Sequence, residues 1–267
     1  MRRQGRERAG RFLAEGSQAV GEAVGWATGS AGHRGGLHEL FVTDRAAARH
    51  PELVAAAADA GARISRVTEA AAAGLSATTT PQGLVAVCRA LPVPAQRAVA
   101  GTRLIVVLAG VADPGNAGTV IRVADAAGAG AVLLAGQAVD PHNGKCVRAS
   151  TGSVFHLPLA VVHEVRDAVR ICRGAGLQVL AADGATGADL DDVADAGVLD
   201  RPTAWLFGSE AHGLAPELLS GSDVVDAVVA VPLHGRAESL NLATAAAVCL
   251  YSSARAHRRR AAKDPIA

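Results

Sequence analysis

The chain has 267 residues, half of them hydrophobic, and a formal net charge of +1 at pH 7. This length suits one large or two modest domains with a substantial core. Because the net charge is near zero, no overall electrostatic field steers the protein to nucleic acid or to a membrane. Because the sequence has neither a run of about 18 apolar residues nor a secretory signal pattern, we expect a soluble, cytoplasmic protein with no membrane partner.

The first predicted elements form a compact α/β module at residues 1–90. A helix-like stretch runs through RFLAEGSQAVGEAV (11–24), and Pro51 and Gly61 suit the start and end of a second helix. This second helix spans 51–61, a third is predicted at 69–75, and strand patterns are predicted at 37–43, 62–68 and 83–90.

Residues 91–102 form a predicted linker, because Pro92 and Pro94 occur there without a sustained period. A larger domain follows at 103–262, where nearly continuous apolar strands such as LIVVLAG (104–110) alternate with helices. This alternation predicts a mostly parallel sheet with helices on both faces and ligands at the strands' carboxyl ends. The other predicted strands are 131–136, 177–182, 204–208 and 228–233, and the helices are about 118–127, 164–176, 215–220 and about 240–257.

Basic residues crowd both ends of the chain. Arginines occupy positions 2, 3, 6, 8 and 11, and six basic or titratable residues lie between Arg255 and Lys263. Basic arms on a near-neutral body often contact phosphate, but solvated ends that keep a chain soluble have the same composition.

Nothing in the sequence predicts a metal site. The cysteines, Cys88, Cys146, Cys172 and Cys249, are far apart and form no CxxC, as expected for buried thiols in a reducing cytosol. The aspartates of DLDDVADAGVLD (189–200) predict a solvated surface turn, since no glycine pattern fixes an octahedral site.

The first unusual constellation is DPGNAGTVIRVADAAG (113–128), which directly follows a predicted buried strand. Asn116 can cap the predicted helix that follows. The N-terminus of a helix suits an anion, and the guanidinium of Arg122 would add a positive charge there. An ordinary βα turn with a surface arginine also fits this spacing, and the glycines do not match the dinucleotide-binding template.

The second constellation is WLFGSEAHGLAPELL (205–219), where a strand ends at Gly208 and Glu210 lies in the following loop. A carboxylate at a strand end can orient a polar ligand, although Glu210 is also a suitable first-turn helix residue. His212 and His234 lack a third ligand at zinc-type spacing.

The third constellation is VPLHGRAESLNLATAAAV (231–248). We expect Ser239 to be the N-cap of the last helix and Asn241 to lie in its first turn. A parallel sheet can bring all three constellations to one crevice. The roles of Glu238 and His234 stay open.

Three segments resemble, in order and spacing, the motifs of the SpoU/TrmH RNA ribose 2′-O-methyltransferases of the SPOUT superfamily: NAGTVIR (116–122), LFGSEAHGL (206–214) and VPLHGRAESLNLATA (231–245). VRASTGSVFHLPL (147–159) resembles the stretch between the first two motifs. FLAEGSQAVGEAV (12–24) and TTTPQGLVAV (78–87) resemble the family's small ribosomal-protein-like substrate-binding domain.

The resemblance implies a catalytic α/β domain with a deep trefoil knot, which no periodicity predicts. It further implies a homodimer with the target nucleotide near the subunit boundary, and S-adenosylmethionine bound in a bent form by the knot loops. The cofactor-binding residues would be Gly208, Val231, Leu240, Leu206 and Leu233.

By the same resemblance, Arg122 faces the ribose 2′-hydroxyl. Because an arginine with a pKa above about 12 is a poor base, we expect it to stabilise charge electrostatically. Asn116, Glu210, Ser239 and Asn241 would position the ribose and Arg122 by hydrogen bonds.

The expected function is 2′-O-methylation of a ribose in structured RNA. The ribosomal-protein-like module favours 23S ribosomal RNA over transfer RNA. A non-catalytic RNA-binding or ribosome-assembly protein is an alternative of another class. The modified nucleotide, and whether the role is housekeeping or antibiotic resistance, stay open.

Overall fold

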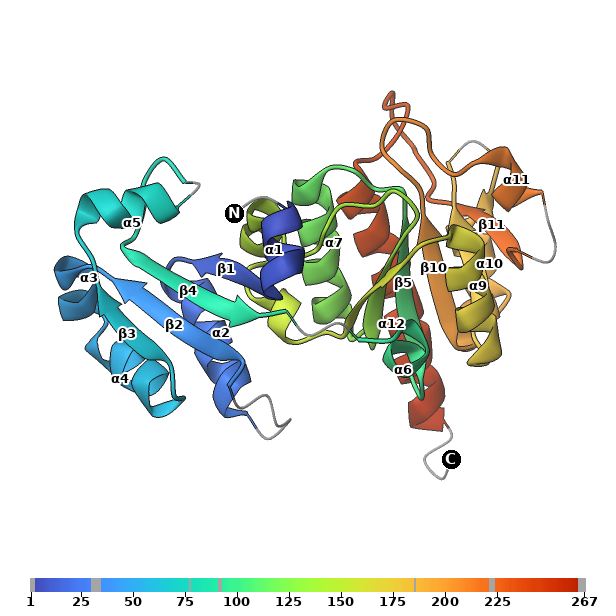
Figure 1. Ribbon diagram of the computed structural model, residues 1–267. Helices are drawn as coiled ribbons and strands as arrows, with labels where there is room; N and C mark the ends of the chain where they lie inside the picture. The colour runs from blue at the N-terminus through green and yellow to red at the C-terminus, as the bar shows by residue number, and fades with distance from the viewer. Residues whose placement is uncertain are drawn as a thin grey trace. The chain divides into compact units, whose positions relative to one another are not determined.

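The computed structural model describes residues 3–29, 35–76, 78–90, 93–184, 186–220 and 224–263. The chain forms two compact units, which are described separately (Figure 1). The first unit comprises Met1–Leu91 with Asp140–His156, and the second comprises Pro92–Val139 with Leu157–Ala267. This division differs from the predicted boundaries, because residues 140–156 were expected in the larger domain.

The first unit contains a four-stranded sheet in the order β1-β4-β2-β3. Strand β4 runs antiparallel to β1 and β2, whereas β2 and β3 are parallel. The strands are β1 (Arg11–Glu15), β2 (Leu37–Val42), β3 (Arg63–Arg66) and β4 (Leu84–Arg89). The helices are α1 (Arg3–Ala9), α2 (Ser17–Thr28), α3 (Asp44–Arg49), α4 (Pro51–Asp59) and α5 (Glu69–Leu75). The α/β prediction for this module is confirmed.

One sequence prediction in the first unit is wrong. Residues 11–15 form strand β1, and only the stretch from Ser17 onward is helical. Phe12 and Ala14 alternate with more exposed neighbours, which is the period of a strand. Gly16 has a φ of 87° and separates the two elements. The pairing of β1 with β4, more than 60 residues along the chain, decides the strand conformation.

The segment Asp140–His156 completes the core of the first unit with helix α8 (Gly144–Ser150) and a 3₁₀ turn at Ser153–Phe155. The Phe155 ring lies 5.6 Å from the rings of both Phe12 and Trp26. The His142 ring lies 4.4 Å from that of Phe12. Burial lowers the pKa of His142, and the Arg6 charge lowers it further, while Asp140 acts in the opposite direction.

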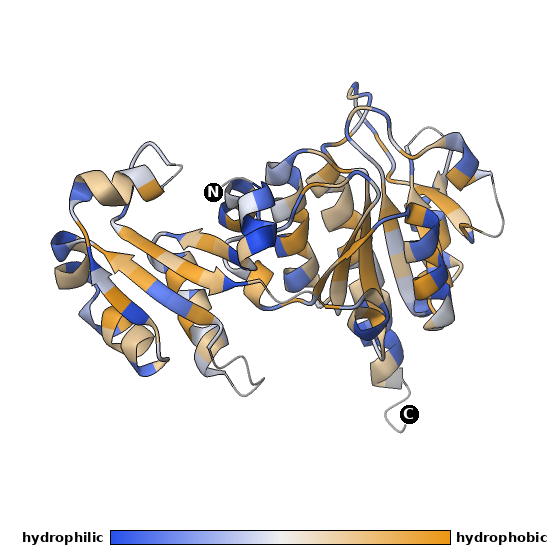
Figure 2. Ribbon diagram, viewed as in Figure 1, coloured by the Kyte–Doolittle hydropathy of each residue, from blue (hydrophilic) through white to orange (hydrophobic). Residues whose placement is uncertain are grey.

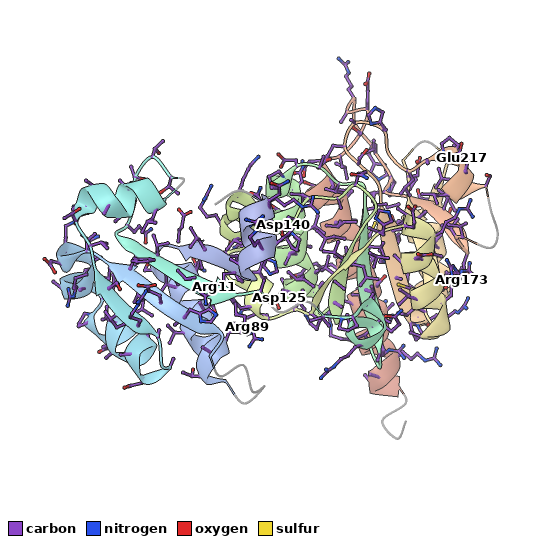
Figure 3. The ribbon with its side chains drawn as sticks, in the orientation of Figure 1. Arg11, Arg89, Asp125, Asp140, Arg173 and Glu217 are labelled. Atoms are coloured by element: carbon purple, nitrogen blue, oxygen red, sulfur yellow. The ribbon has the colours of Figure 1, made fainter. Side chains whose placement is uncertain are left out.

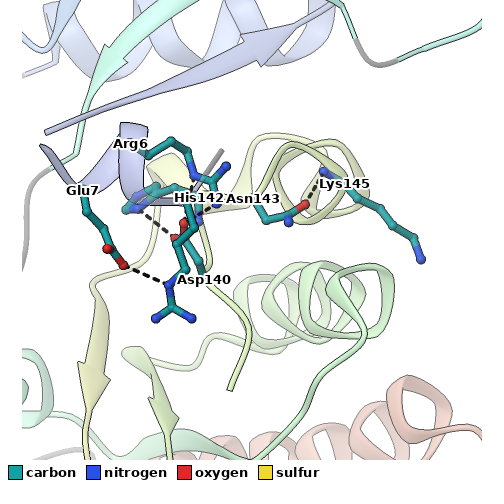
Figure 4. A network of polar contacts seen from close by, with 7 residues as sticks. Arg6, Glu7, Asp140, His142, Asn143 and Lys145 are labelled. Atoms are coloured by element: carbon teal, nitrogen blue, oxygen red, sulfur yellow. Dashed lines mark hydrogen bonds and ion pairs between the residues drawn. The ribbon is translucent and has the colours of Figure 1, made fainter. Parts of the chain in front are cut away.

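Arg6 does not belong to a free basic arm. Its Nε and Nη2 atoms donate to Asp140 Oδ2 at 2.8 and 2.6 Å (Figure 4). The two side chains are only 9% and 14% exposed, so this ion pair is largely desolvated. The expectation that the N-terminal arginines form a solvated or RNA-facing arm is therefore wrong for Arg6, whereas Arg8 and Arg11 are exposed.

The second unit contains a seven-stranded sheet in the order β7-β6-β5-β10-β8-β11-β9, in which every recorded pairing is parallel. The predicted parallel sheet is confirmed, while the trefoil knot stays a prediction. The strands are β5 (Leu104–Ala109), β6 (Ala131–Ala135), β7 (Leu159–Val162), β8 (Gln178–Ala182), β9 (Ala188–Asp189), β10 (Thr203–Phe207) and β11 (Ala227–Ala230).

Every residue of β5, β6 and β10 is buried, as their continuous apolar runs predict (Figure 2). Helices α6 (Ala95–Val99) and α9 (Val165–Gly174) contribute to the core on one face of the sheet. Helices α7 (Pro114–Ala127) and α12 (Leu242–Lys263) pack against each other and against β5. Trp205 of β10 donates from its indole nitrogen to Ser253 Oγ of α12 at 2.9 Å.

Several boundaries in the second unit differ from the predictions. Residues 95–99 of the predicted linker form α6, whose alanines and Val99 are buried. The predicted acidic turn contains α10 (Leu190–Asp195) and a 3₁₀ turn at Val198–Asp200, with Leu190 and Leu199 buried. A four-residue helix, α11 (Pro216–Leu219), follows β10 as expected.

All four cysteines are buried and form no disulfide with one another, as the sequence predicts. Burial raises the pKa of Cys88, Cys172 and Cys249 to about 12, so these thiols stay protonated near neutral pH. Among the described residues, no helix combines the length and apolar character needed to cross a bilayer.

Replacing Arg6 by Met should destabilise the protein, because Asp140 would keep a buried charge without its partner. Loss of one member of a buried pair at this exposure costs about 2–4 kcal/mol of unfolding free energy. The matched control is Arg8→Met, because Arg8 is exposed and should change stability by less than about 0.5 kcal/mol. Urea denaturation measures both, and equal stabilities would contradict the assignment.

Candidate active site

A pocket of about 600 Å³ lies at the carboxyl ends of β8, β10 and β11 in the second unit. Its walls come from the loops after these strands, from Asn116 at the start of α7, and from the first residues of α12. The parallel arrangement brings these ends to one edge of the sheet. The expected convergence of three motif-bearing loops therefore occurs within one unit.

A line of hydrogen bonds joins the three loops. Asn116 Nδ2 donates to Glu210 Oε1 at 2.8 Å, and Asn116 Oδ1 accepts from Asn241 Nδ2 at 3.1 Å. Asn241 Oδ1 in turn accepts from the backbone N–H of Ala243 at 2.9 Å. The carboxylate at one end and the helix N–H at the other determine the orientation of both amides. We call Glu210, Asn116 and Asn241 the amide relay.

The caps of two helices differ from the predictions. Helix α7 begins at Pro114, and the side chain of Asp113 accepts from the backbone N–H of Asn116 at 2.8 Å. Asp113 is therefore the cap, and the amide of Asn116 is left for the relay. Helix α12 begins at Leu242, so Asn241 is its cap in place of Ser239. Ser239 lies two residues earlier, exposed on the pocket wall.

Gly208 is required by the tight turn after β10. A Cβ atom at this position would lie 2.2 Å from the carbonyl carbon of Gly213 and 2.5 Å from the nitrogen of Leu214. Ser209 and Gly213 exchange backbone hydrogen bonds of 3.1 and 2.9 Å, and Gly213 has a φ of 63°. This turn presents Glu210 at the pocket mouth.

The loop from Leu233 to Leu240 contributes both polar backbone groups and apolar side chains to the pocket wall. In the described part of the chain, the backbone of residues 233–240 makes no hydrogen bond. These N–H and C=O groups are therefore available to water or to a ligand. Leu233 is 39% exposed and Leu240 is half-buried, so the same wall is apolar in part. Such a wall suits a flat heterocycle with hydrogen-bonding edges.

Eight of the predicted site residues line this pocket: Asn116, Glu210, Ser239, Asn241, Gly208, Val231, Leu240 and Leu233. Glu238 lines it as well. Leu206 does not, because it is fully buried in the core between β5 and β8, and its neighbour Phe207 lines the pocket instead. Successive strand residues point to opposite faces of the sheet. The motif match alone does not show which of two neighbouring residues faces the pocket.

Arg122 does not line the pocket of its own chain. It is the ninth residue of α7, it is exposed, and it makes no hydrogen bond or ion pair within the described residues. Its guanidinium is thus available to an external anion.

The sequence interpretation missed Asp183 and Gly184, which follow β8 and line the pocket. Their position at the end of an apolar strand was the signal that could have identified them. No group of three or more His, Cys, Asp or Glu residues in the described part of the chain is arranged to hold a metal ion.

Comparison with known families matches residues 103–251 to the SpoU rRNA Methylase family and residues 1–86 to the MRM3-like substrate binding domain. The 23S rRNA (guanosine(2553)-2′-O)-methyltransferase of Bacillus subtilis is 33% identical over 240 residues. That alignment covers 90% of this chain and 87% of the relative.

Two solved structures match almost the whole chain. The AdoMet-bound rRNA methyltransferase from Sinorhizobium meliloti has a TM-score of 0.76 at 30% identity, covering 95% of this chain and 90% of its own. The SpoU methyltransferase AviRb from Streptomyces viridochromogenes, in complex with AdoMet (S-adenosylmethionine), has a TM-score of 0.78 at 29% identity. It covers 97% of this chain and 95% of its own.

The parallel sheet, the strand-end pocket and these matches define a methyltransferase with an N-terminal substrate-binding domain. The chain belongs to the SpoU rRNA Methylase family, which confirms the resemblance of the three sequence motifs.

Replacing Gly208 by Ala should lower the affinity for S-adenosylmethionine at least about tenfold, because the added methyl displaces the turn that forms the pocket wall. Calorimetric titration of the full chain measures this affinity. Gly174→Ala is the matched control, since Gly174 has open space around its Cβ position and lies outside this pocket. Unchanged affinity in Gly208→Ala would exclude the turn from cofactor binding.

Proposed function

We propose that this protein transfers a methyl group from S-adenosylmethionine to a ribose 2′-hydroxyl of ribosomal RNA, with 23S RNA as the substrate. The amide relay carries this proposal, because it joins the three motif loops in one pocket. The names of the relatives support the substrate class, and the match to a substrate-binding domain supports RNA recognition by the first unit.

The pocket fits the cofactor in size and chemistry. Its volume of about 600 Å³ lies in the range of small-molecule sites. Gly208, Val231 and Leu240 would hold the cofactor, with the unpaired backbone of the 233–240 loop as hydrogen-bonding partners. When bound, S-adenosylmethionine supplies a methyl group already activated by its sulfonium charge.

The remaining task of the protein is to orient the ribose oxygen and to stabilise the negative charge that develops on it. Glu210, held by Asn116, and the exposed Ser239 hydroxyl provide the polar contacts for the ribose. The relay sets the position of Glu210, so little reorganisation of this carboxylate is needed when the substrate binds, whereas Ser239 lies in the loop without backbone hydrogen bonds.

Arg122 acts electrostatically in this proposal, toward the 2′-oxygen and the neighbouring phosphate. Because it lies outside the pocket of its own chain, we place its action at the boundary of a homodimer. Val248 and Tyr251 of α12 are 38% and 49% exposed, and the Tyr251 hydroxyl donates to Ala126 O of α7 at 3.5 Å. This surface of α7 and α12 is the proposed dimer face.

Replacing Arg122 by Ala should lower kcat at least about 100-fold, as for loss of one charge-stabilising group, and should leave the affinity for S-adenosylmethionine within twofold. Arg97→Ala is the control, since Arg97 is an exposed arginine on α6. Methyl transfer to 23S RNA and calorimetry provide the two readouts. If Arg122 acts on the partner's pocket, mixing Arg122→Ala with Ser239→Ala chains should restore activity. An active Arg122→Ala variant would refute its role.

The substrate class is tested by incubating the protein with labelled S-adenosylmethionine and total RNA, then mapping ribose methylation at nucleotide resolution. We expect a single 2′-O-methylated position in 23S RNA. Methylation confined to transfer RNA would replace the proposed substrate. Binding of RNA without methyl transfer would instead support the ribosome-assembly alternative.

A further inference from the structure

Two arginines lie directly opposite each other on the sheet of the first unit. Arg11 is the first residue of β1 and Arg89 is the last residue of β4, and the two are Cα partners in the antiparallel register. Both are exposed. Figure 3 labels both of them at the end of the sheet where β1 begins and β4 ends. Directly paired residues share one face of a sheet, so both side chains lie opposite the buried Phe12 and Cys88.

Within the described residues, no acidic side chain forms an ion pair with Arg11 or Arg89. Neither guanidinium makes a hydrogen bond or ion pair within the described residues. The nearby acid on the same face, Glu39, is engaged by Arg63, with Nη2–Oε2 at 2.7 Å and Nε–Oε1 at 3.0 Å. Glu39 also accepts from the Ser65 hydroxyl at 2.6 Å. The hydrogen bonds of Arg63, the largest cause, and the more distant charge of Arg11 both lower the pKa of Glu39, but in the described residues only Arg63 forms an ion pair with it.

The positive charges of Arg11 and Arg89 act on the neighbouring side chain of His38. His38 lies at a register irregularity in β2, between Leu37 and Glu39. Burial lowers the pKa of His38, and the charges of Arg11 and Arg89 lower it further. His38 is therefore neutral at pH 7. It adds no charge to the two arginines and provides no negative charge that could balance them.

The backbone prevents the two arginines from separating by fraying of the strand ends. The Arg89 N–H donates to Gly36 O at 2.7 Å, and the Ala90 N–H donates to Gly10 O at 2.8 Å. Like charges placed directly across two strands destabilise a sheet. An anion that binds both guanidiniums would remove this repulsion, and a phosphate group accepts the paired hydrogen bonds that two guanidiniums offer.

We propose that Arg11 and Arg89 bind a phosphodiester of the RNA substrate and thereby position it on the first unit. The inference rests on the proposed function, because it takes RNA as the ligand. Leu13 and Val87, the neighbouring paired residues on this face, are aliphatic, and the half-buried Phe41 lies further along the same face, paired with Val85. Because a phosphodiester is the same at every nucleotide, the contact supplies affinity and register without reading the base sequence.

The test uses the full-length double variant Arg11→Gln/Arg89→Gln and in vitro transcribed 23S RNA, with Arg63→Gln as the matched control on the same face. Filter binding over a salt series gives the slope of log K against log salt. Loss of the contact should weaken binding about tenfold at moderate salt and reduce the slope by about 1. In methyl transfer, KM for RNA should rise while kcat and cofactor affinity stay unchanged.

Thermal unfolding separates this role from a structural one. Because the substitution removes like-charge repulsion, the midpoint of the double variant should equal or exceed that of the wild type. Arg63→Gln should leave the salt slope unchanged. A double variant with wild-type slope, or one with a lower midpoint and unchanged RNA affinity, overturns the proposal.

The same experiment distinguishes failure of this inference from failure of the proposed function. A wild type that binds 23S RNA but transfers no methyl group refutes only the enzymatic proposal, and the salt slopes still decide the arginine contact. A wild type that methylates the RNA while the double variant keeps its slope and KM refutes only the contact. A wild type that binds no RNA overturns both.

Discussion

The hydrogen bonds between Glu210, Asn116 and Asn241 are the constraint on which the site depends. A primary amide has a donor end and an acceptor end, so two amides in series connect a carboxylate to a helix N–H without an unmatched group. The relay ties the loops after β5, β10 and β11 into one wall. Through its second bond to Ala243, Asn241 also sets where α12 begins. The geometry of the pocket and the start of the final helix are thus determined together.

The sheet beneath the relay supplies rigidity, and the loops above it supply chemistry. Strands β5 and β10 are buried along their whole length, which leaves no freedom to shift register without exposing apolar side chains. By contrast, the backbone of residues 233–240 makes no hydrogen bond in the described structure. Polar groups left unpaired beside a rigid frame are the expected condition of a site whose partner is a ligand.

Arginine serves two opposite purposes in the first unit. Arg6 is desolvated and paired with Asp140, which lies within the stretch matched to the SpoU family model at residues 103–251. The core of the first unit therefore depends on residues encoded in the middle of the methyltransferase sequence. Arg11, five residues further along the chain, is exposed and without an acidic partner. Burial and the presence of a carboxylate, not residue type, separate a stabilising arginine from one available to phosphate.

The sequence by itself determined the parallel sheet, the position of its buried strands and the three loops that carry the site, because apolar runs, glycines and turn residues act locally. The tertiary structure alone decided which side chains meet. Strand pairing with β4 made residues 11–15 a strand, Asp113 took the cap that left Asn116 free for the relay, and strand alternation placed Phe207, not Leu206, at the pocket. The pairing of β1 with β4 and the bonds of Asn116 to Glu210 and Asn241 depend on partners that are distant along the chain, and local patterns carry no information about such partners. The Asp113 cap lies only three residues from Asn116, but those distant bonds decide what the amide of Asn116 contacts.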